Sequence, residues 1–500
     1  MERKWWTLLA VCVAMFMLLL DITIVNVALP EIQRDLDASF SDLQWVVDAY
    51  SLTLAAVLLT AGSLGDRLGR RNVFAIGFGV FTVASLFCGL ATDPTSLNIA
   101  RAVQGVGGAA MFATSLALIA QEFTGPQRAT AFGIWGATVG GAVAIGPLVG
   151  GALTDGLGWE WIFFVNVPIG IAAIALTLMR VAESRDRDAQ RIDLPGVVTF
   201  SVALFLLVFA LVRGNAEGWS SVQITGSLIG AAVLMLAFVA IELRTSHPMF
   251  DLALFRKPAF VGVSAAAFAL SAGMFSMFLY LTIYMQGVLG YDPLEAGVRF
   301  LPVTLLSFFV APAAGRLLTR VPARVFLGGG LALVGTGLLL MRGLDPGSEW
   351  TALLAGFMVA GAGIGMINPA IASTAVGVVS AAKAGMGSGI NNTARQVGIA
   401  TGIAALGALF ESGISDRLPA DAPEGAAEGV ASTGTQAAQQ GGPGAVEAAG
   451  QAFIGSLNEI LLIGALVAFA GGALALLLTR ERDLVAHGAP EEVQAEAAAA

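Results

Sequence analysis

The sequence predicts an all-α integral membrane protein with about fourteen transmembrane helices, and three observations support this fold class. Apolar residues make up 56% of the 500 residues and charged residues 12%, about half of the charged share in a soluble globular protein. The mean hydropathy is +0.80, and the apolar residues gather in long blocks. These features exclude a soluble enzyme and a disordered scaffold. The net charge of -9 excludes a nucleic-acid binder, which needs a basic surface.

Each apolar block is long enough to cross a bilayer, which requires about 20 mostly apolar residues in a helix. The first block follows Met1-Glu-Arg-Lys. It is too long for a secretory signal and no small-x-small cleavage site follows it, so we expect it to be the first span. The expected spans are residues 7–29, 43–64, 72–91, 97–120, 130–153, 160–181, 194–213, 222–243, 258–288, 296–318, 323–342, 350–373, 386–411 and 453–478.

Lysine and arginine are distributed unevenly between alternate connections. With the N-terminus inside, nineteen of the 26 basic residues fall in inner segments and five in outer loops. The positive-inside rule then predicts that both termini, including a tail at 479–500, are cytoplasmic. The connection 412–451 is rich in Ala, Gly, Gln and acidic residues, and we expect a flexible, solvated extracellular loop there.

A glycine-acid-base motif follows the second span. Its glycines permit a tight reversal, and its acid can pair with a neighbouring arginine or cap the next helix. A solvated charge run is the simpler interpretation. The residues of interest are Gly62, Gly65, Asp66, Arg67, Gly69 and Arg70.

Two spans near the N-terminus carry embedded charges. Arg101 and Gln104 lie three residues apart and therefore share a face of the fourth span. An arginine within a span usually faces the bundle interior or a water-filled cavity, although a structural pair between helices is the alternative. Asp21 lies roughly 12 Å below the outer end of the first span, where a polar packing contact is the alternative. Asp48 is a second acid, nearer the rim of the second span, where solvation is nearly as plausible.

The fifth span contains the pattern Gly146, Pro147, Gly150 and Gly151. Small residues at this spacing let helices approach closely, and a proline inside a helix removes a backbone donor and kinks it. By itself the pattern indicates only tight packing.

These motifs together resemble a known family. The motif after the second span resembles the cytoplasmic signature of the major facilitator superfamily. The stretch from Arg101 to Gly108 is similar to the fourth-span motif of that superfamily, in which the arginine is linked to proton transfer. The Gly146 pattern looks like the signature of its antiporters. Residues 20–30, 286–293 and 387–398 resemble the branch of fourteen-helix drug/proton antiporters, which are multidrug resistance efflux transporters.

The resemblance implies an N-terminal six-helix bundle (1–181), a linker with two extra central helices (182–257) and a C-terminal six-helix bundle (258–478). Asp21, Arg101 and Asp48 become candidates for proton coupling, because a secondary antiporter needs an embedded group that changes protonation. The two glycine-rich motifs become candidates for conformational gating. The substrate is expected at the central interface between the bundles.

Substrate contacts are expected mainly from the ninth and thirteenth spans. Methionine and aromatic side chains suit loosely specified apolar ligands, although such a stripe is more often helix packing. Arg395 lies inside the thirteenth span beside amide side chains, and we expect it to line the cavity or anchor a gate. The candidate cavity residues are Asn26, Gln104, Met274, Phe278, Tyr280, Tyr284, Gln286, Asn392, Arg395 and Gln396.

The predicted function is proton-coupled export of hydrophobic or cationic drugs across the bacterial plasma membrane by a monomer embedded in the lipid bilayer. No lysine forms a Walker motif, and His247 and His487 suggest no catalytic or metal site, so we expect no enzyme activity and no cofactor beyond the proton-motive force. Three alternatives remain open. They are a dedicated exporter of an endogenous metabolite such as a self-made antibiotic, a non-transporting membrane sensor, and an uptake symporter.

Overall fold

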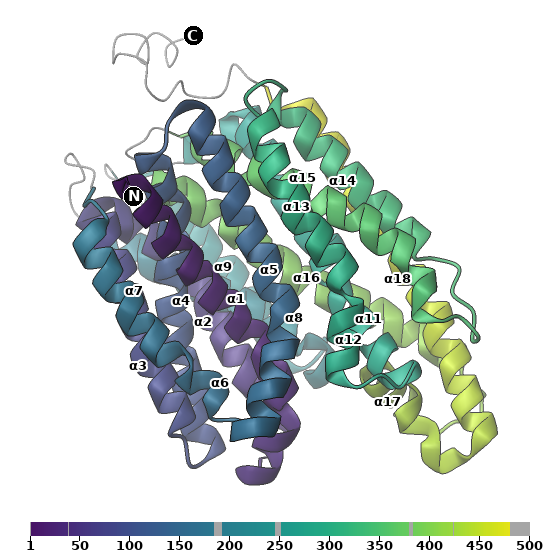
Figure 1. Cartoon of the computed structure of the whole chain (residues 1–500). Coiled ribbons are helices and arrows are strands. Elements are labelled where there is room, and N and C mark those ends of the chain that lie inside the picture. Colours follow the sequence, from purple (N-terminus) through teal and green to yellow (C-terminus); the bar gives the residue numbers. More distant parts are fainter. Residues whose placement is uncertain are drawn as a thin grey trace.

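The computed structural model describes residues 2–38, 40–184, 193–245, 252–379, 384–423 and 425–480. These ranges contain helices joined by short connections and no β-strand, so the expectation of an all-α chain is confirmed. Most helices lie side by side with similar axis directions (Figure 1). Large apolar side chains such as Met179, Val222 and Phe309 are exposed on the outside, as expected of a surface that faces lipid.

The first half of the chain forms one group of helices, drawn in purple to blue in Figure 1. Within it, α2 and α3 pack on α4, and α1 packs on α5. The expected sixth span is divided, because Val165 separates α6 from α7. The helices are α1 (Arg3–Asp35), α2 (Phe40–Leu68), α3 (Arg70–Gly89), α4 (Pro94–Glu122), α5 (Gly125–Leu157), α6 (Trp161–Phe164) and α7 (Asn166–Arg180).

Several helices begin at a side chain that caps the first turn. Asp93 accepts a hydrogen bond from the Ser96 N–H at 2.9 Å at the start of α4, and this bond lowers the pKa of Asp93. Asp292 and Glu295 form a capping box at the start of α12 (Pro293–Arg299). These caps satisfy N–H groups that a helix end leaves without partners.

Two helices, α8 (Leu194–Glu217) and α9 (Val222–Glu242), come between the halves in sequence. They pack on each other, and α8 also packs on α2 of the first half and on α16 (Ala384–Ser415) of the second. A hydrophobic core that includes Leu52, Phe200 and Ile390 fills the space where α2, α8 and α16 meet. The extra pair is therefore attached to both halves.

The second half forms the group drawn in green to yellow in Figure 1. Its first expected span contains two π-helical turns, η2 and η3, on either side of α11. Its second is divided at Phe300 between α12 and α13. The elements not yet named are η1 (Leu252–Arg256), α10 (Pro258–Leu270), η2 (Ser271–Phe275), α11 (Met277–Ile283), η3 (Tyr284–Val288), α13 (Leu301–Leu317), α14 (Ala323–Leu340), η4 (Trp350–Leu353), α15 (Leu354–Gly377), α17 (Ala426–Thr433), η6 (Gly434–Gly441) and α18 (Pro443–Leu478).

Twelve helices in the described ranges are long and apolar enough to cross a membrane. Two of the expected spans are not among the twelve. The glycine-rich α5 has 33 residues, and α13 is an apolar helix of 17 residues. A multi-pass membrane protein is therefore supported, while the expected number of fourteen spans is not confirmed.

The segment 412–451, expected to be a flexible loop, is largely helical where it is described. It comprises the end of α16, then α17, η6 and the start of α18. Its chain reverses at Gly425, Gly434 and Gly442, whose φ angles are 80°, 66° and 83°. The Thr435 hydroxyl donates a hydrogen bond to the Gly287 carbonyl at 2.7 Å, which fastens the segment to η3. The expectation of a loop without regular structure was wrong, because the alanines of this segment favour helix and its glycines permit the turns between helices.

Candidate functional site

A carboxylate and a guanidinium are paired in the interior of the first half. Asp21 lies in α1 and Arg101 in α4, and Arg101 Nη1 is 2.5 Å from Asp21 Oδ2. Both residues are only 1% exposed. An isolated buried charge is costly, so each of these groups depends on the other for its compensation. The structure thus brings together the two residues that the sequence selects first for proton coupling.

Three further polar side chains complete a network around this pair. Gln104 accepts a hydrogen bond from Arg101 Nη1 at 2.6 Å and donates one to Asp21 Oδ1 at 2.8 Å. Asn166 donates to Asp21 Oδ1 at 3.4 Å and to the Ser85 hydroxyl at 3.0 Å. All three surrounding residues are at most 2% exposed. Because they belong to α3, α4 and α7, a change in the protonation of Asp21 would alter hydrogen bonds between four helices.

Arg101 makes two further contacts with α2. Its Nε donates to the Val46 carbonyl at 2.9 Å, and its guanidinium carbon lies 4.4 Å from the centroid of the Tyr50 ring. The Tyr50 hydroxyl is buried and has no hydrogen-bond partner among the described residues. The contact of Tyr50 with Arg101 therefore runs through the face of its ring, as a cation–π interaction.

Sequence reasoning missed Ser85 and Asn166. Each is a small polar residue inside an apolar block, where such side chains commonly form hydrogen bonds between helices. That signal was present, but many other serines and threonines in the spans share it.

Asp48 does not belong to this network. Its Oδ2 atom is 4.0 Å from Nη1 of Arg213, which also pairs with Glu217 one turn further along α8 at 2.9 Å. The Arg213 guanidinium lies 5.6 Å from the centroid of the Trp45 ring. Arg213 is the last residue of the expected span 194–213. It lies within α8 and is 6% exposed. Asp48 therefore forms its ion pair with Arg213 of the extra helix pair and not with Arg101.

Asp66 connects the two halves at the end of α2. Its Oδ1 atom accepts a hydrogen bond from Arg70 Nε at 2.8 Å and forms an ion pair with Arg70 Nη2 at 2.7 Å. Its Oδ2 atom accepts one from the Met386 N–H at 2.9 Å. Met386 lies in the first turn of α16, so Asp66 faces the positive end of that helix dipole. Arg67, the other basic candidate next to Asp66, is half-buried.

The glycines of this motif permit close approaches between segments. Gly69 has a φ of 109°, and a Cβ atom at this position would collide with the Glu183 carboxylate, which binds the first turn of α3. A Cβ atom at Gly65 would lie 2.7 Å from Cγ2 of Thr114 on α4. Gly62 is buried within α2.

The glycines of α5 contact helices of both halves. A Cβ atom at Gly146 would collide with Thr23 of α1, and one at Gly133 would lie 2.9 Å from the Ala311 carbonyl of α13. Gly150 is buried, whereas a Cβ atom at Gly151 would meet nothing within 4 Å. Close packing therefore requires the first of the four expected gating residues of α5 and not the last.

Two of the selected residues cannot be placed in full. Asn26 belongs to α1 and Pro147 to α5, but the side chains of both lie outside the described part of the structure.

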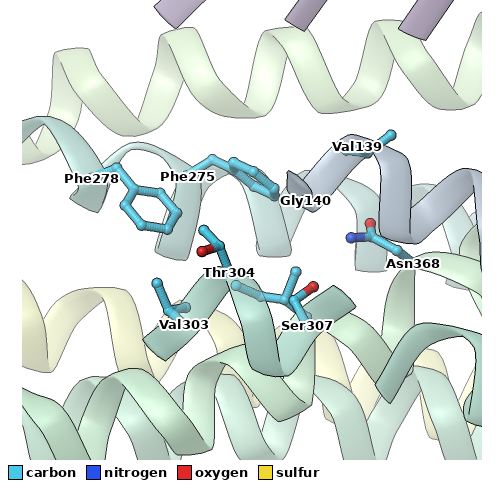
Figure 2. Close-up of a pocket in the computed structure, with 9 residues that line it drawn as sticks. Val139, Gly140, Phe275, Phe278, Val303, Thr304, Ser307 and Asn368 are labelled. Atoms are coloured by element: carbon cyan, nitrogen blue, oxygen red, sulfur yellow. The ribbon is translucent and has the colours of Figure 1, made fainter. Parts of the chain in front are cut away.

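A small cavity lies where α5 of the first half meets η2, α11, α13 and α15 of the second (Figure 2). Its volume is about 20 Å³, which is room for about one water molecule. A drug-sized ligand needs several hundred Å³, so the protein is closed at this point. The lining residues are Val139, Gly140, Phe275, Phe278, Val303, Thr304, Ser307, Ile364 and Asn368.

Arg395 of α16 lies directly behind the wall of this cavity. Its Nη1 atom donates to Asn368 Oδ1 at 3.1 Å, and its guanidinium carbon lies 5.5 Å from the centroid of the Phe275 ring. Arg395 is 7% exposed. Because both contacts are with lining residues, Arg395 supports the cavity and contributes its charge to it.

Of the candidate cavity residues whose side chains are described, only Phe278 lines this cavity. Met274 is completely buried in the core of the second half. The hydroxyls of Tyr280 and Tyr284 donate to the backbone carbonyls of Ile403 at 2.8 Å and Ser348 at 3.3 Å. These residues pack the second half.

The amide candidates divide in the same way. Gln104 belongs to the Asp21 network and does not line the cavity. Asn392 is buried and donates to the Ser388 hydroxyl at 3.4 Å within α16. Gln286 and Gln396 are half-buried in η3 and α16. Across the described ranges, no group of three or more His, Cys, Asp or Glu side chains is arranged to hold a metal ion.

The chain is similar to proteins of known families over most of its length. The sequence profile of the Major Facilitator Superfamily matches residues 11–403. The Multidrug resistance protein Stp of Mycobacterium tuberculosis is 39% identical over 82% of this chain and 77% of its own. The Tetracenomycin C resistance and export protein of Streptomyces glaucescens is 36% identical over 83% and 78%, and the Puromycin resistance protein pur8 of Streptomyces alboniger is 37% identical over 81% and 81%.

The likeness extends to a solved structure. The human organic anion transporter MFSD10 superposes with a TM-score of 0.63 over 94% of this chain and all of its own, at 13% sequence identity, which shows a shared fold. The family profile covers well over half of the residues, and the curated relatives exceed 30% identity over most of the chain. The chain therefore belongs to the major facilitator superfamily.

Proposed function

We propose that this protein is a proton-coupled antiporter that exports hydrophobic or cationic drugs. The names of the relatives, which describe drug and antibiotic resistance and export, support drug efflux as its work. In this proposal the protein lies in the bacterial plasma membrane as a monomer with both termini in the cytoplasm. It spans the membrane fourteen times, with α5 and α13 crossing it in addition to the twelve helices that are long and apolar enough to do so. Its energy comes from the proton-motive force, without a cofactor.

The enclosed Asp21–Arg101 network is the observation that carries proton coupling. A nearby guanidinium favours the ionised form of a carboxylate, whereas apolar surroundings alone favour the neutral form. If α1 and α4 separate, Asp21 loses its partner and takes up a proton. When the network forms again, Arg101 displaces that proton.

Ethidium efflux from energised cells that express the protein tests this proposal. We expect the wild type to expel ethidium, and we expect a protonophore to stop the efflux. The Asp21→Asn variant should show no efflux above that of cells without the protein, because its side chain does not release a proton. Expression in the membrane is checked for each variant by immunoblot.

Asp48→Asn is the matched control. It neutralises another acid of the first half that pairs with Arg213 instead of Arg101, so we expect protonophore-sensitive efflux to persist. Efflux that survives Asp21→Asn and disappears in Asp48→Asn would transfer the coupling role to Asp48. Efflux that ignores the protonophore would refute proton coupling altogether.

A dedicated exporter of one metabolite is the second candidate. Two of the relatives are named for a single antibiotic each, tetracenomycin C and puromycin. A well-expressed wild type that expels no ethidium would favour this function, and the proton-coupling network would then serve that one substrate.

A further inference from the structure

The cavity between the two halves has unused hydrogen-bond donors at one end. Asn368 and Ser307 both line it and are 1% and 2% exposed. Asn368 Nδ2 and the Ser307 hydroxyl have no hydrogen-bond partner among the described residues. Figure 2 shows Asn368 at the opposite end of the cavity from Phe278. Buried polar atoms without partners are costly, so this end is suited to an atom that the described residues do not supply.

The orientation of the Asn368 amide follows from its neighbour. Arginine has only donors, so the atom of Asn368 that faces Arg395 Nη1 must be the oxygen. The amide nitrogen is then left for the cavity. A donor whose own oxygen accepts from a cation is polarised and becomes a stronger donor. This end of the cavity therefore offers hydrogen-bond donors, and a ligand that binds there must supply an acceptor atom.

The charge behind this end is positive and uncompensated. Arg395 makes one hydrogen bond, to Asn368, and one ring contact, to Phe275, and within the described ranges no carboxylate lies within ion-pair distance of it. Arg101, another arginine that is buried within a helix, is neutralised by Asp21. A buried cation without a counter-ion attracts an anion from any ligand that reaches it.

The remaining wall is apolar and aromatic. Phe275 and Phe278 contact each other with ring centroids 6.1 Å apart, and Phe278 also contacts Phe300 at 5.5 Å. The Thr304 hydroxyl is satisfied by the carbonyls of Phe300 and Leu301, so this residue presents no free donor. Rings arranged in this way suit the flat face of an aromatic ligand.

We propose that this cavity is the closed form of a subsite for planar aromatic ligands that carry an anionic oxygen, such as a phenolate or a carboxylate. Asn368 and Ser307 bind the oxygen, the charge of Arg395 attracts it, and Phe275 and Phe278 cover the ring. The inference rests on the proposed export function and adds anionic aromatic compounds to its ligand class. Cationic drugs are then weaker ligands of this subsite. Because the closed cavity holds about one water molecule, α5 must separate from α13 before the ligand enters.

Equilibrium binding of two dyes to the purified protein in detergent tests this assignment. Fluorescein and a cationic rhodamine share a planar tricyclic ring system and differ in charge. Fluorescence polarisation at a mildly alkaline pH measures the Kd of each dye, with no membrane and no proton gradient. We expect the wild type to bind fluorescein more tightly than the rhodamine.

Four variants distinguish the effect of the Arg395 charge on binding from a general loss of folding. Arg395→Gln should weaken fluorescein binding about ten- to a hundred-fold, as expected for loss of an interaction with a charged group, while rhodamine binding stays the same or improves. Arg395→Lys should keep the preference for fluorescein. Ser307→Ala should weaken fluorescein binding about three- to tenfold and leave rhodamine binding unchanged. Arg316→Gln removes a charge from an exposed position at the end of α13 and should change neither.

Two results would overturn the proposal. One is a wild type that binds the rhodamine as tightly as fluorescein, which needs no variant to fold. The other is an equal rise in the Kd of both dyes in the Ser307→Ala or the Arg395→Gln variant. Failure of the proton-coupled export proposal is a separate result, because it appears as efflux that ignores a protonophore and leaves dye binding in detergent intact.

Discussion

Removing the negative charge of Asp21 should destabilise the folded protein much more than removing both charges of its pair. The Asp21→Asn variant keeps the shape of the side chain and leaves Arg101 as a cation in a position that is 1% exposed. Arg101 retains the carbonyl of Val46, the amide oxygen of Gln104 and the ring of Tyr50. It loses the opposite charge. The amide nitrogen that replaces one carboxylate oxygen cannot accept a hydrogen bond, so the bond from Arg101 or the bond from Gln104 is lost as well.

The size of the effect follows from the geometry. With an atom-to-atom distance of 2.5 Å, the charge centres lie about 4 Å apart, and their attraction at an effective dielectric constant of about 20 is about 4 kcal/mol. Breaking a buried pair from one side generally costs about 3–5 kcal/mol. The double variant Asp21→Asn with Arg101→Gln leaves no charge behind, and we expect it to lie within about 1 kcal/mol of the wild type.

A double-mutant cycle measures this difference. The free energy of unfolding of the wild type, both single variants and the double variant is obtained in detergent micelles by denaturant titration, followed by the fluorescence of the eight tryptophans. We expect a coupling free energy of about 3 kcal/mol or more between the two positions. Additive effects of the two substitutions would refute the reasoning, because they would mean that neither charge depends on the other.

Two further predictions concern groups that contact these motifs. Tyr50→Phe should leave the free energy of unfolding unchanged or slightly higher, because it deletes a buried hydroxyl that has no partner among the described residues. Tyr50→Leu should lower it by about 1–2 kcal/mol through loss of the cation–π contact with Arg101, and equal effects of the two variants in the same titration would contradict this. Asp66→Asn should weaken the cap of α16 by about 1–2 kcal/mol, which hydrogen exchange detects as faster exchange of amides in the first turn of that helix. Unchanged exchange there would show that the cap contributes nothing.

The sequence was informative about helices because an apolar block of sufficient length has few alternatives to a membrane span. The points where helices break were harder to predict from the sequence. The break at Phe300 and the π-helical turns η2 and η3 lie inside continuous apolar blocks. At η2 the chain packs closely against Gly398 and Gly402 of α16, so its local geometry depends on residues more than a hundred positions away.

The candidate site was predictable to a similar extent. Asp21 and Arg101 were selected because charges are rare within spans, and the structure pairs them. Asn368 and Ser307 were not selected, because uncharged polar residues are common in spans and nothing local indicates which of them remain without partners. Their significance depends on Arg395 and on the meeting of α5 with α13, which are tertiary facts.

The contact between Asp48 and Arg213 has a consequence for modularity. Because α8 and α9 lie between the two halves in sequence and pack on each other, one could expect to remove them without affecting either half. Yet α8 supplies the cation that faces Asp48 of α2, and it fills part of the core between α2 and α16. A shortened chain that joins the halves directly would leave that acid of α2 without its partner and that core open. The pair α8 and α9 is therefore an integral part of the scaffold, and any derivative without it requires compensating changes on α2 and α16.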